Sequence, residues 1–333
     1  MIRCQRRINM LIRPRRNRLH AGLRAGVEET HIGTKNLIVP IFLVDGANVR
    51  ESIPSLKMAN RLSLDQAFVE IEDCISMGLD KFIIFPVVKE SLKDSIASYS
   101  YSADNFYLHA AKEMKIKFPE ILLISDVALD PYSSDGHDGI VRNGEILNDE
   151  TLPILVKMAL AQASHGFDII GPSDMMDGRV HAIREALEEN GFVNTGIMSY
   201  TAKYASAFYG PFRDALDSAP KFGDKKTYQM NPANKREALL EGELDTMEGA
   251  DFLMVKPALH YLDVIQTMKE NFTLPIVAYH VSGECAMLQA ACDNGWLDFD
   301  TALFETLLSI RRAGADFIIT YFAKSFAANQ FKK

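Results

Sequence analysis

Short apolar runs alternate with longer segments of helical periodicity along most of this 333-residue chain. Strands that are apolar throughout are buried on both faces, which is typical of parallel strands covered by helices. Eight runs predict such strands: Leu37–Val44, Lys81–Val88, Ile121–Asp130, Asp168–Asp174, Thr195–Lys203, Phe252–Pro257, Pro275–Gly283 and Asp316–Phe322. The periodic segments between them predict helices: Leu64–Met77, Asp104–Lys117, Thr151–His165, Arg179–Asn190, Asn234–Glu248, His260–Phe272 and Thr301–Arg312.

This alternation predicts an α/β fold, a (β/α)₈ TIM barrel, with a doubly wound sheet as the main alternative. No Gly-x-Gly-x-x-Gly motif follows a strand, and polar residues gather at the carboxyl ends of the strands, so both observations favour the barrel. Active sites of such barrels lie at that end. We therefore expect the chemistry just after Asp126, Asp174, Tyr200, Lys256, Ser282 and Tyr321. Residues 36–333 are assigned to the catalytic barrel and residues 1–35 to an extended N-terminal arm.

The predicted arm is basic, although the whole chain has a net charge of −8. Eight arginines lie between Arg3 and Arg24, and no acidic residue precedes Glu28. The segment could dock on a partner subunit, target the chain to an organelle, or form an unstructured tail. It lacks the serine enrichment of a transit peptide and runs directly into the first strand, so we favour docking. Met10 is an alternative start.

Charge and cysteine usage exclude several classes of protein. A net charge of −8 argues against a nucleic-acid-binding body. No apolar run is long enough to span a membrane. The cysteines form no Cys-x-x-Cys pair, and no secretory signal is present, so a reducing, cytoplasmic compartment is expected and the thiols are interpreted as idle: Cys4, Cys74, Cys285 and Cys292.

Two lysines end neighbouring predicted strands, and they are the strongest candidates for catalysis. Lys203 ends the fifth strand and Lys256 ends the sixth. Burial at a strand end disfavours an ammonium ion, and neighbouring strands lie only about 4.8 Å apart, so the two charges would also repel. A neutral amine is what imine formation requires. A single such lysine would more often be a residue at the barrel rim, but a pair predicts two carbonyl substrates.

The loop after the third strand is rich in carboxylates. Asp126 ends the strand, and Asp130, Asp135 and Asp138 follow it, with His137 between the last two. These groups could bind a hard cation or act as acid, base and electrostatic partners of the lysines. A polar loop with Asx turns is the alternative interpretation.

Other residues could anchor the carboxylates of a substrate. The segment 204–228 follows the fifth strand, is rich in aromatic residues, glycine and proline, and shows no obvious helix, so it predicts a lid. It and its flank contain Arg213, Lys225, Lys226 and Gln229. Ser282 and Tyr321 end the seventh and eighth predicted strands and could hold a second anion.

Six motifs together resemble the porphobilinogen synthase (5-aminolevulinate dehydratase) family, over nearly the whole chain from Arg13 to Ala327. They are SDVALDPYSSDGHDG, IIGPSDMMDGRV, MSYTAKYASAFYGPFRDA, YQMNPAN, LMVKPA and VSGE, which begin at Ser125, Ile169, Met198, Tyr228, Leu253 and Val281. The family condenses two 5-aminolevulinate molecules to porphobilinogen in tetrapyrrole (heme and chlorophyll) biosynthesis, with loss of two waters. It is a hydro-lyase family.

The resemblance implies a role for each candidate. Lys256 matches the lysine that holds the propionate-side substrate as a Schiff base, and Lys203 matches its acetate-side counterpart. Asp126 is the candidate for relaying protons near Lys203. The resemblance places acetate-side carboxylate contacts at Arg213, Lys225 and Gln229, and propionate-side contacts at Ser282 and Tyr321. Many family members have arginine at the position of Lys225, and lysine lacks that bidentate fork.

Metal use follows from the same comparison. Zinc-using members carry three cysteines where this chain has Ala128, Asp130 and Asp138, so it resembles the aspartate-containing subgroup and no catalytic zinc is expected. Asp130 and Asp138 could hold a magnesium ion or only position water. Glu241 matches the ligand of a separate activating Mg²⁺ site, with Asp174 in its outer shell; Glu237 is a weaker partner. From residues alone, Glu237 and Glu241 would form a solvated surface pair.

In the family, the activating site lies between subunits of an octamer whose arms embrace neighbouring barrels. The resemblance therefore implies a homo-octamer of arm-exchanged dimers under allosteric control, with Arg13–Arg16 docking on an acidic neighbour. Two alternatives stay open: a class I aldolase on the same barrel, and a non-catalytic protein that binds nucleic acid through its basic arm.

Overall fold

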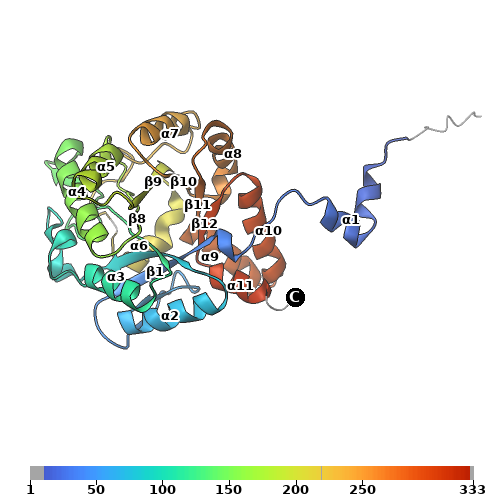
Figure 1. The fold of residues 1–333 in the computed structure, drawn as a ribbon, viewed down its shortest axis with the longest axis horizontal. Coiled ribbons are helices and arrows are strands. Elements are labelled where there is room, and N and C mark those ends of the chain that lie inside the picture. Colours follow the sequence, from blue (N-terminus) through green and yellow to red (C-terminus); the bar gives the residue numbers. More distant parts are fainter. Residues whose placement is uncertain (1–10, 219, 331–333) are drawn as a thin grey trace, which may run out of the picture. The chain divides into compact units, whose positions relative to one another are not determined.

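Eight parallel strands close into a barrel in the computed structural model, which describes residues 11–218 and 220–330 (Figure 1). The order around the sheet is β12-β11-β10-β9-β8-β5-β4-β1, and β1 also pairs with β12, which closes the ring. The predicted TIM barrel is therefore confirmed. The barrel strands are β1 (Leu37–Val44), β4 (Lys81–Val87), β5 (Leu122–Ile124), β8 (Ile169–Ile170), β9 (Gly196–Lys203), β10 (Phe252–Lys256), β11 (Ile276–His280) and β12 (Phe317–Thr320).

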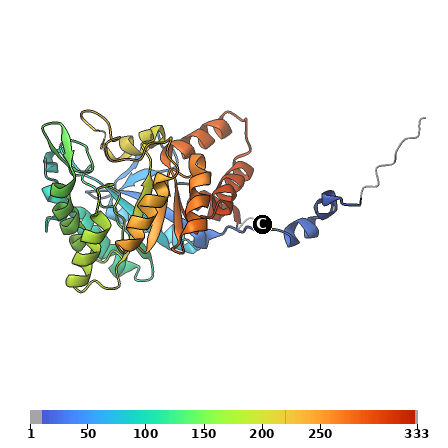
Figure 2. The ribbon, with the colours of Figure 1, turned by 90° about the horizontal axis from the view of Figure 1, so that it is seen from above.

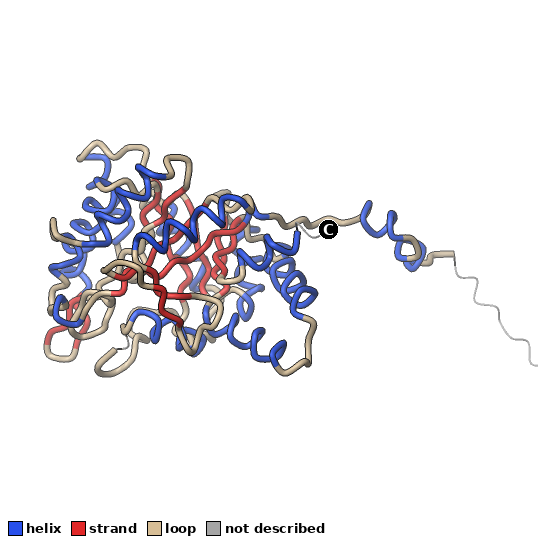
Figure 3. Tube along the Cα trace, turned by 90° about the horizontal axis from the view of Figure 1, so that it is seen from below, coloured by secondary structure: helices blue, strands red, loops and turns tan. Residues whose placement is uncertain are grey.

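Helices surround the strands on all sides of the ring (Figures 2 and 3). The predicted helices are present with small differences at their ends: α2 (Leu64–Ser76), α3 (Phe106–Lys117), α4 (Asn148–Ser164), α5 (Arg179–Glu189), α7 (Glu237–Met247), α8 (Leu262–Asn271) and α10 (Phe299–Arg312). Three further barrel helices were not predicted: α6 (Gly210–Leu216), α9 (Ser282–Asp293) and α11 (Ala323–Gln330). Single-turn helices are η2 (Thr34–Asn36), η3 (Glu90–Leu92), η4 (Ser98–Tyr101), η5 (Ala207–Tyr209) and η6 (Leu259–Tyr261).

Two antiparallel pairs decorate the loops. The first joins β2 (Arg50–Ser52) to β3 (Asn60–Leu62), which also pairs with the outer part of β1. The second is a hairpin of β6 (Ile140–Arg142) and β7 (Glu145–Leu147) in the long segment that follows β5. Both lie outside the closed ring.

Two predicted strands are much shorter than expected. The runs Ile121–Asp130 and Asp168–Asp174 contribute only Leu122–Ile124 and Ile169–Ile170 to the regular ladder. Beyond these residues the two segments stay bonded irregularly, through Val127 N to Gly171 O at 2.9 Å and Ser173 N to Val127 O at 3.0 Å. Close approach is the cause, because a side chain at Gly171 would meet the Ser125 carbonyl at 2.5 Å.

The interior of the barrel is filled with side chains. In β1 the burial is continuous from Leu37 to Leu43, as expected for a strand covered on both faces. Aromatic side chains pack inside the barrel, where Phe42 stacks on Tyr321 and Phe85 stacks on Tyr279, at ring-centroid distances of 5.9 and 6.4 Å. Charged side chains gather at the carboxyl ends of β9 and β10, where Lys203 and Lys256 lie, and that end carries the site described below.

Residues 11–31 belong to a compact unit of their own, and a second unit begins at Ile32. The first unit contains η1 (Pro14–Arg18) and α1 (Ala21–Gly26), whose first turn is capped by the His20 ring accepting from Gly22 N. None of residues 11–31 is buried. Met10 and the basic residues before it lie outside the described residues. Across residues 11–218 and 220–330, no helix is long and apolar enough to cross a membrane.

Candidate active site

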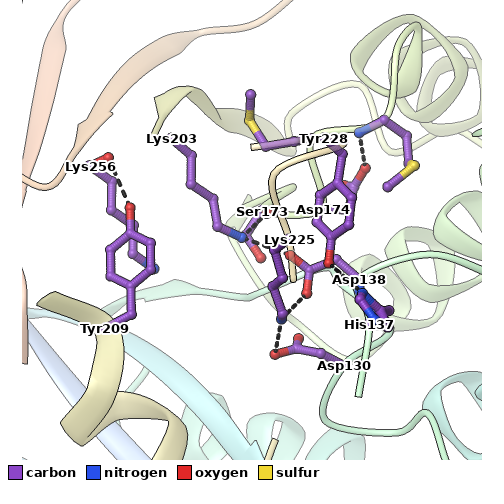
Figure 4. Close-up of polar contacts among 12 residues, drawn as sticks. Asp130, His137, Asp138, Ser173, Asp174, Lys203, Tyr209, Lys225, Tyr228 and Lys256 are labelled. Carbon is purple, nitrogen blue, oxygen red and sulfur yellow. Dashed lines mark hydrogen bonds and ion pairs between the residues drawn. The ribbon is translucent and has the colours of Figure 1, made fainter. Parts of the chain in front are cut away.

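Lys203 and Lys256 lie side by side at the carboxyl ends of β9 and β10 (Figure 4). They are partners in the strand register, and each is the last residue of its strand. Both are buried, with 6% and 5% of their surfaces exposed. The structure thus brings together the two amines that the strand pattern predicted.

Lys203 lies among oxygen atoms. Its ammonium donates to Asp138 Oδ2 at 3.0 Å and to the carbonyl of Ser173. Lys225 approaches the same carboxylate from the lid, at 2.5 Å from Asp138 Oδ1 and 3.2 Å from Asp130 Oδ2. Burial alone would raise the pKa of Asp138, but Lys203 and Lys225 outweigh it and lower that pKa to about 2. Asp138 is therefore an anion shared by two ammonium groups.

Lys256 lies among aromatic rings. Its Nζ is 4.6 Å from the ring centroid of Tyr279, and the other rings lie at similar distances: Phe212 at 4.9 Å, Tyr200 at 5.0 Å and Tyr209 at 5.1 Å. Within the described part of the chain, its ammonium forms no ion pair. Burial, reinforced by the charge of Lys203, lowers the pKa of Lys256 to about 7. A substantial fraction of this amine is neutral near pH 7, as an imine-forming nucleophile requires.

Asp126 lies close enough to both lysines to interact with their charges. Its backbone is fixed by Gln162, whose side chain donates to the Asp126 carbonyl at 2.9 Å. Burial and the neighbouring Asp130 raise the pKa of Asp126 to about 6, although Lys256 and Lys203 oppose the shift. A carboxyl group with this pKa can both accept and release a proton near neutral pH.

The segment 204–228 covers the lysines and is partly helical, so the expectation of a helix-free lid was wrong. It contains η5 (Ala207–Tyr209) and α6, which starts at Gly210-Pro211. Glycine and proline resembled a loop signal, but proline is well tolerated in the first turn of a helix. The lid is held by His137, whose ring nitrogens lie 3.1 Å from Tyr228 Oη and 3.1 Å from the Phe222 carbonyl oxygen.

The predicted acetate-side anchors differ in how they are engaged. Arg213 is half-buried in α6, and its guanidinium group forms no hydrogen bond or ion pair with the described residues. Gln229 is buried, and its Oε1 has no partner among them. Lys225 is already bound to Asp130 and Asp138, and Lys226 is exposed beside Asp224. Arg213 and Gln229 are thus the groups with free hydrogen-bonding capacity.

Ser282 and Tyr321 follow β11 and β12 closely. Ser282 was expected to end a strand, but it is the first residue of α9. Its Oγ accepts from Phe212 N at 3.0 Å. Tyr321 is 7% exposed and its hydroxyl lies 2.9 Å from that of Tyr279. The free N–H groups of a helix start favour an anion, so this position still suits a carboxylate.

Glu241 and Asp174 form no hydrogen bond or ion pair with Lys203 or Lys256 among the described residues, although Asp174 directly follows Ser173 and lies close enough to Lys203 to interact with its charge. Glu241 is half-buried on α7 and lines a cavity of about 880 Å³, so it is not a solvated surface residue. Burial raises its pKa to about 7. Asp174 is fully buried: Oδ1 accepts from Met176 N, Oδ2 has no partner among the described residues, and burial raises its pKa to about 7 as well. Arg179 lies close enough to lower both values.

Sequence reasoning missed four residues that surround the amines. Ser173 acts through its backbone carbonyl, which no side-chain pattern reveals. The missed aromatic residues around Lys256 come from two separate segments, the lid and β11, so only their abundance in the lid was visible: Tyr209, Phe212 and Tyr279.

Comparison with known proteins identifies the family. The family model described as delta-aminolevulinic acid dehydratase matches residues 11–329. The chain belongs to the delta-aminolevulinic acid dehydratase family. A delta-aminolevulinic acid dehydratase of Bradyrhizobium diazoefficiens is 52% identical over 96% of this chain and 91% of that protein. One of Chlamydia pneumoniae is 52% identical over 93% of this chain and 94% of its own length.

A solved structure agrees with this assignment. The Toxoplasma gondii delta-aminolevulinic acid dehydratase, in complex with its reaction product porphobilinogen, superposes with a TM-score of 0.94 at 49% identity. The match covers 95% of this chain and 91% of that one. The chain is thus a hydro-lyase of porphyrin biosynthesis that condenses two molecules of 5-aminolevulinate to porphobilinogen. The aldolase and nucleic-acid-binding alternatives are overturned by this result.

Members of the family depend on metal in general, so each candidate metal position was compared with its surroundings. Among the described residues, no three histidine, cysteine, aspartate or glutamate side chains form a cluster suited to a metal ion. Asp130 and Asp138 do not fit a resident cation, because the ammonium groups of Lys203 and Lys225 already neutralise them. Glu241 fits better: its carboxylate has no ion-pair partner in residues 11–218 and 220–330 and lies beside a polar cavity, and Mg²⁺ commonly keeps most of its waters and takes one or two carboxylates.

Proposed function

We propose that the condensation proceeds through imines on both lysines, beginning at Lys256. The observation that carries this proposal is the lowered pKa of Lys256, about 7, in an aromatic enclosure beside an ion-paired Lys203. The neutral amine attacks the keto carbon of the first substrate, and the resulting carbinolamine loses water to form the imine.

Lys203 binds the second substrate after transferring its proton. Asp138 and the Ser173 carbonyl hold its ammonium until then, and Asp126 is the acceptor suited by its position and its pKa of about 6. Loss of a proton beside the imine gives an enamine nucleophile. The second water leaves when the Lys203 imine forms, and carbon–carbon and carbon–nitrogen bond formation at the two imine carbons then join the substrates and release both lysines as amines.

The carboxylates of the two substrates are assigned to two separate groups of residues. On the acetate side, Arg213 and Gln229 have unused hydrogen-bonding capacity, and Lys225 contributes positive charge beside them. On the propionate side, the hydroxyl groups of Ser282 and Tyr321 receive the carboxylate near the start of α9. The lid excludes water from the site, which protects imines from hydrolysis. Orienting two reactants in this way can remove roughly 7–11 kcal/mol from a barrier.

Borohydride reduction tests the central step. With 5-aminolevulinate present, it should convert the Lys256 imine into a stable secondary amine that mass spectrometry locates after digestion. Recovery of unmodified Lys256 under conditions where the enzyme is active would overturn the proposal.

We also propose an activating Mg²⁺ at Glu241, with Asp174 linked to it through water. When bound, the ion would supply positive charge beside two carboxyl groups whose pKa values burial raises to about 7. The test compares porphobilinogen formation in chelator, in Mg²⁺ and in Zn²⁺, for the native chain and for Glu241→Ala. The variant should lose Mg²⁺ stimulation and keep basal turnover; stimulation of equal size in both proteins would move the site elsewhere.

Assembly and location are proposed on the family resemblance. The chain would form a cytoplasmic homo-octamer of arm-exchanged dimers, in which Arg13–Arg16 docks on an acidic neighbour and Mg²⁺ acts allosterically. Deleting residues up to Arg24 should release smaller species in light scattering. An unchanged mass would exclude the arm from assembly.

A further inference from the structure

Glu284 is a buried carboxylate that the proposed mechanism does not use. It lies in the first turn of α9, and its side chain is 0% exposed. A buried carboxylate is costly unless hydrogen bonds replace its hydration. The hydrogen bonds that Glu284 accepts therefore indicate its structural role.

The two oxygens of Glu284 bind backbone groups from two different strand ends. Oε1 accepts from Leu259 N at 2.8 Å and from His260 N at 3.3 Å. Oε2 accepts from Val281 N at 3.0 Å. Leu259 is three residues beyond Lys256, and Val281 immediately precedes Ser282. One carboxylate thus joins the backbone that follows the amine to the backbone that precedes the proposed carboxylate anchor.

Glu284 also reaches the lid through His260. The His260 Nδ1 lies 3.2 Å from Glu284 Oε1, and the ring stacks on Phe208 with centroids 4.2 Å apart and planes 19° apart. Phe208 also touches α9 directly, because a side chain at Gly283 would meet the Phe208 carbonyl oxygen at 2.5 Å. The next lid residue, Tyr209, donates its hydroxyl to the Lys256 carbonyl at 3.0 Å. The lid therefore contacts both segments that Glu284 joins, the one after Lys256 and the start of α9.

We infer that Glu284 is a positioning residue for the Lys256 half of the reaction, setting the separation of Lys256 and Ser282 and seating the lid through His260. The inference rests on the proposed role of Lys256. A substrate bound at both ends, by an imine and by a carboxylate contact, requires a set distance between the two groups. Misplacement by about 1 Å can cost about a hundredfold in rate.

Glu284→Gln is the sharpest test, because it keeps the shape and one acceptor oxygen. Its new NH₂ group must face either Val281 N or the Leu259 and His260 amides, and donor then meets donor. We expect KM for 5-aminolevulinate to rise roughly 10- to 100-fold, with a smaller change in kcat. Borohydride adduct on Lys256 at limiting substrate should fall by a similar factor and recover at saturation.

Glu270→Gln is the matched control, since Glu270 is an exposed glutamate on α8 that contacts only Gln266 among the described residues. It should leave KM and the Lys256 adduct unchanged. If native protein forms the adduct and Glu284→Gln behaves like this control, the inference is overturned while the proposed function stands. If native protein forms no adduct on Lys256, the proposed function itself fails.

His260 variants decide the outcome if Glu284→Gln does not fold. His260→Phe keeps a ring against Phe208, whereas His260→Ala removes it. With equal thermal midpoints, both variants should raise KM, because each removes the ring nitrogen that contacts Glu284, and only His260→Ala should also expose the lid to limited proteolysis. Native KM and native protection from proteolysis in both variants would show that the lid is not seated through His260.

Discussion

Lys203 and Lys256 are neighbours in register, yet their surroundings are opposite. Lys203 is hydrogen-bonded to Asp138 and to the Ser173 carbonyl, whereas Lys256 is enclosed by four aromatic rings and has no ion pair within the described residues. Aromatic faces attract a cation, but here burial and the charge of Lys203 dominate and the pKa of Lys256 falls to about 7. Equivalent strand positions therefore carry amines prepared for different steps.

In the mechanism that we propose, this contrast gives the two substrates an order. The amine that is already partly neutral can react first, while the ion-paired amine must first transfer a proton. Asp126, with a pKa of about 6, interacts with both lysines and can receive that proton. The asymmetry of the product is thus matched by an asymmetry of the two amines.

Removing either amine should have the largest effect. We expect Lys256→Met and Lys203→Met each to lower kcat for porphobilinogen by a factor on the order of 10⁴ or more, since each removes a covalent nucleophile. Discontinuous assays of purified variants measure this. Near-normal porphobilinogen synthesis by either variant would break the comparison, because one imine would then suffice.

Removing the shared anion should cost stability. Asp138→Asn leaves the buried Lys203 and Lys225 ammonium groups with less compensation, so the free energy of unfolding should fall by about 3–5 kcal/mol in urea titrations. Asp224→Asn breaks the exposed pair with Lys226, which solvent screens, and should leave the free energy of unfolding nearly unchanged. Similar losses in the two variants would mean that Asp138 does not act as a buried ion-pair partner.

The pH dependence of trapping sharpens the comparison further. If Lys256 reacts as the neutral amine, as we propose, its initial rate of adduct formation should rise as the pH increases through about 7. Lys203→Met removes a positive neighbour, so the pKa of Lys256 should rise. The pH at which the trapping rate increases should then move up by roughly one pH unit. Asp126→Asn removes a negative neighbour and should move it down. Coincident profiles for all three proteins would show that neither charge acts on Lys256.

The smallest expected effect concerns the aromatic enclosure. Tyr209→Phe removes the hydroxyl that donates to the Lys256 carbonyl, so unfolding free energy should fall by about 0.5–1.5 kcal/mol and trapping at Lys256 should slow a few-fold. Tyr204→Phe removes a comparable hydroxyl bond, to the Asn234 carbonyl at 2.9 Å. The Tyr204→Phe variant should lose similar stability but form the Lys256 adduct at the normal rate. Slowed adduct formation in both variants would show that Tyr209 has no specific role.

Much of the fold could be predicted because its signal is local. A strand covered on both faces must be apolar along its length, so β1, β9 and β10 were visible as continuous runs. The lysines at the ends of β9 and β10 were visible for the same reason, since a cation ending an apolar run is conspicuous. The short β5 and β8 were overestimated, because the close approach at Gly171 depends on a neighbouring segment rather than on local pattern.

The charge state of the site was decided only by tertiary structure. Asp138 and Lys225 are 87 residues apart, yet they meet at 2.5 Å beside Lys203. Sequence alone marked Lys225 as a free anion anchor and Asp138 as a candidate metal ligand, since loop residues carry no periodicity that pairs them. Sequence thus determined a barrel with two amines at adjacent strand ends. Folding decided which amine is neutral, because burial and Coulomb interactions depend on distances between segments remote in the chain.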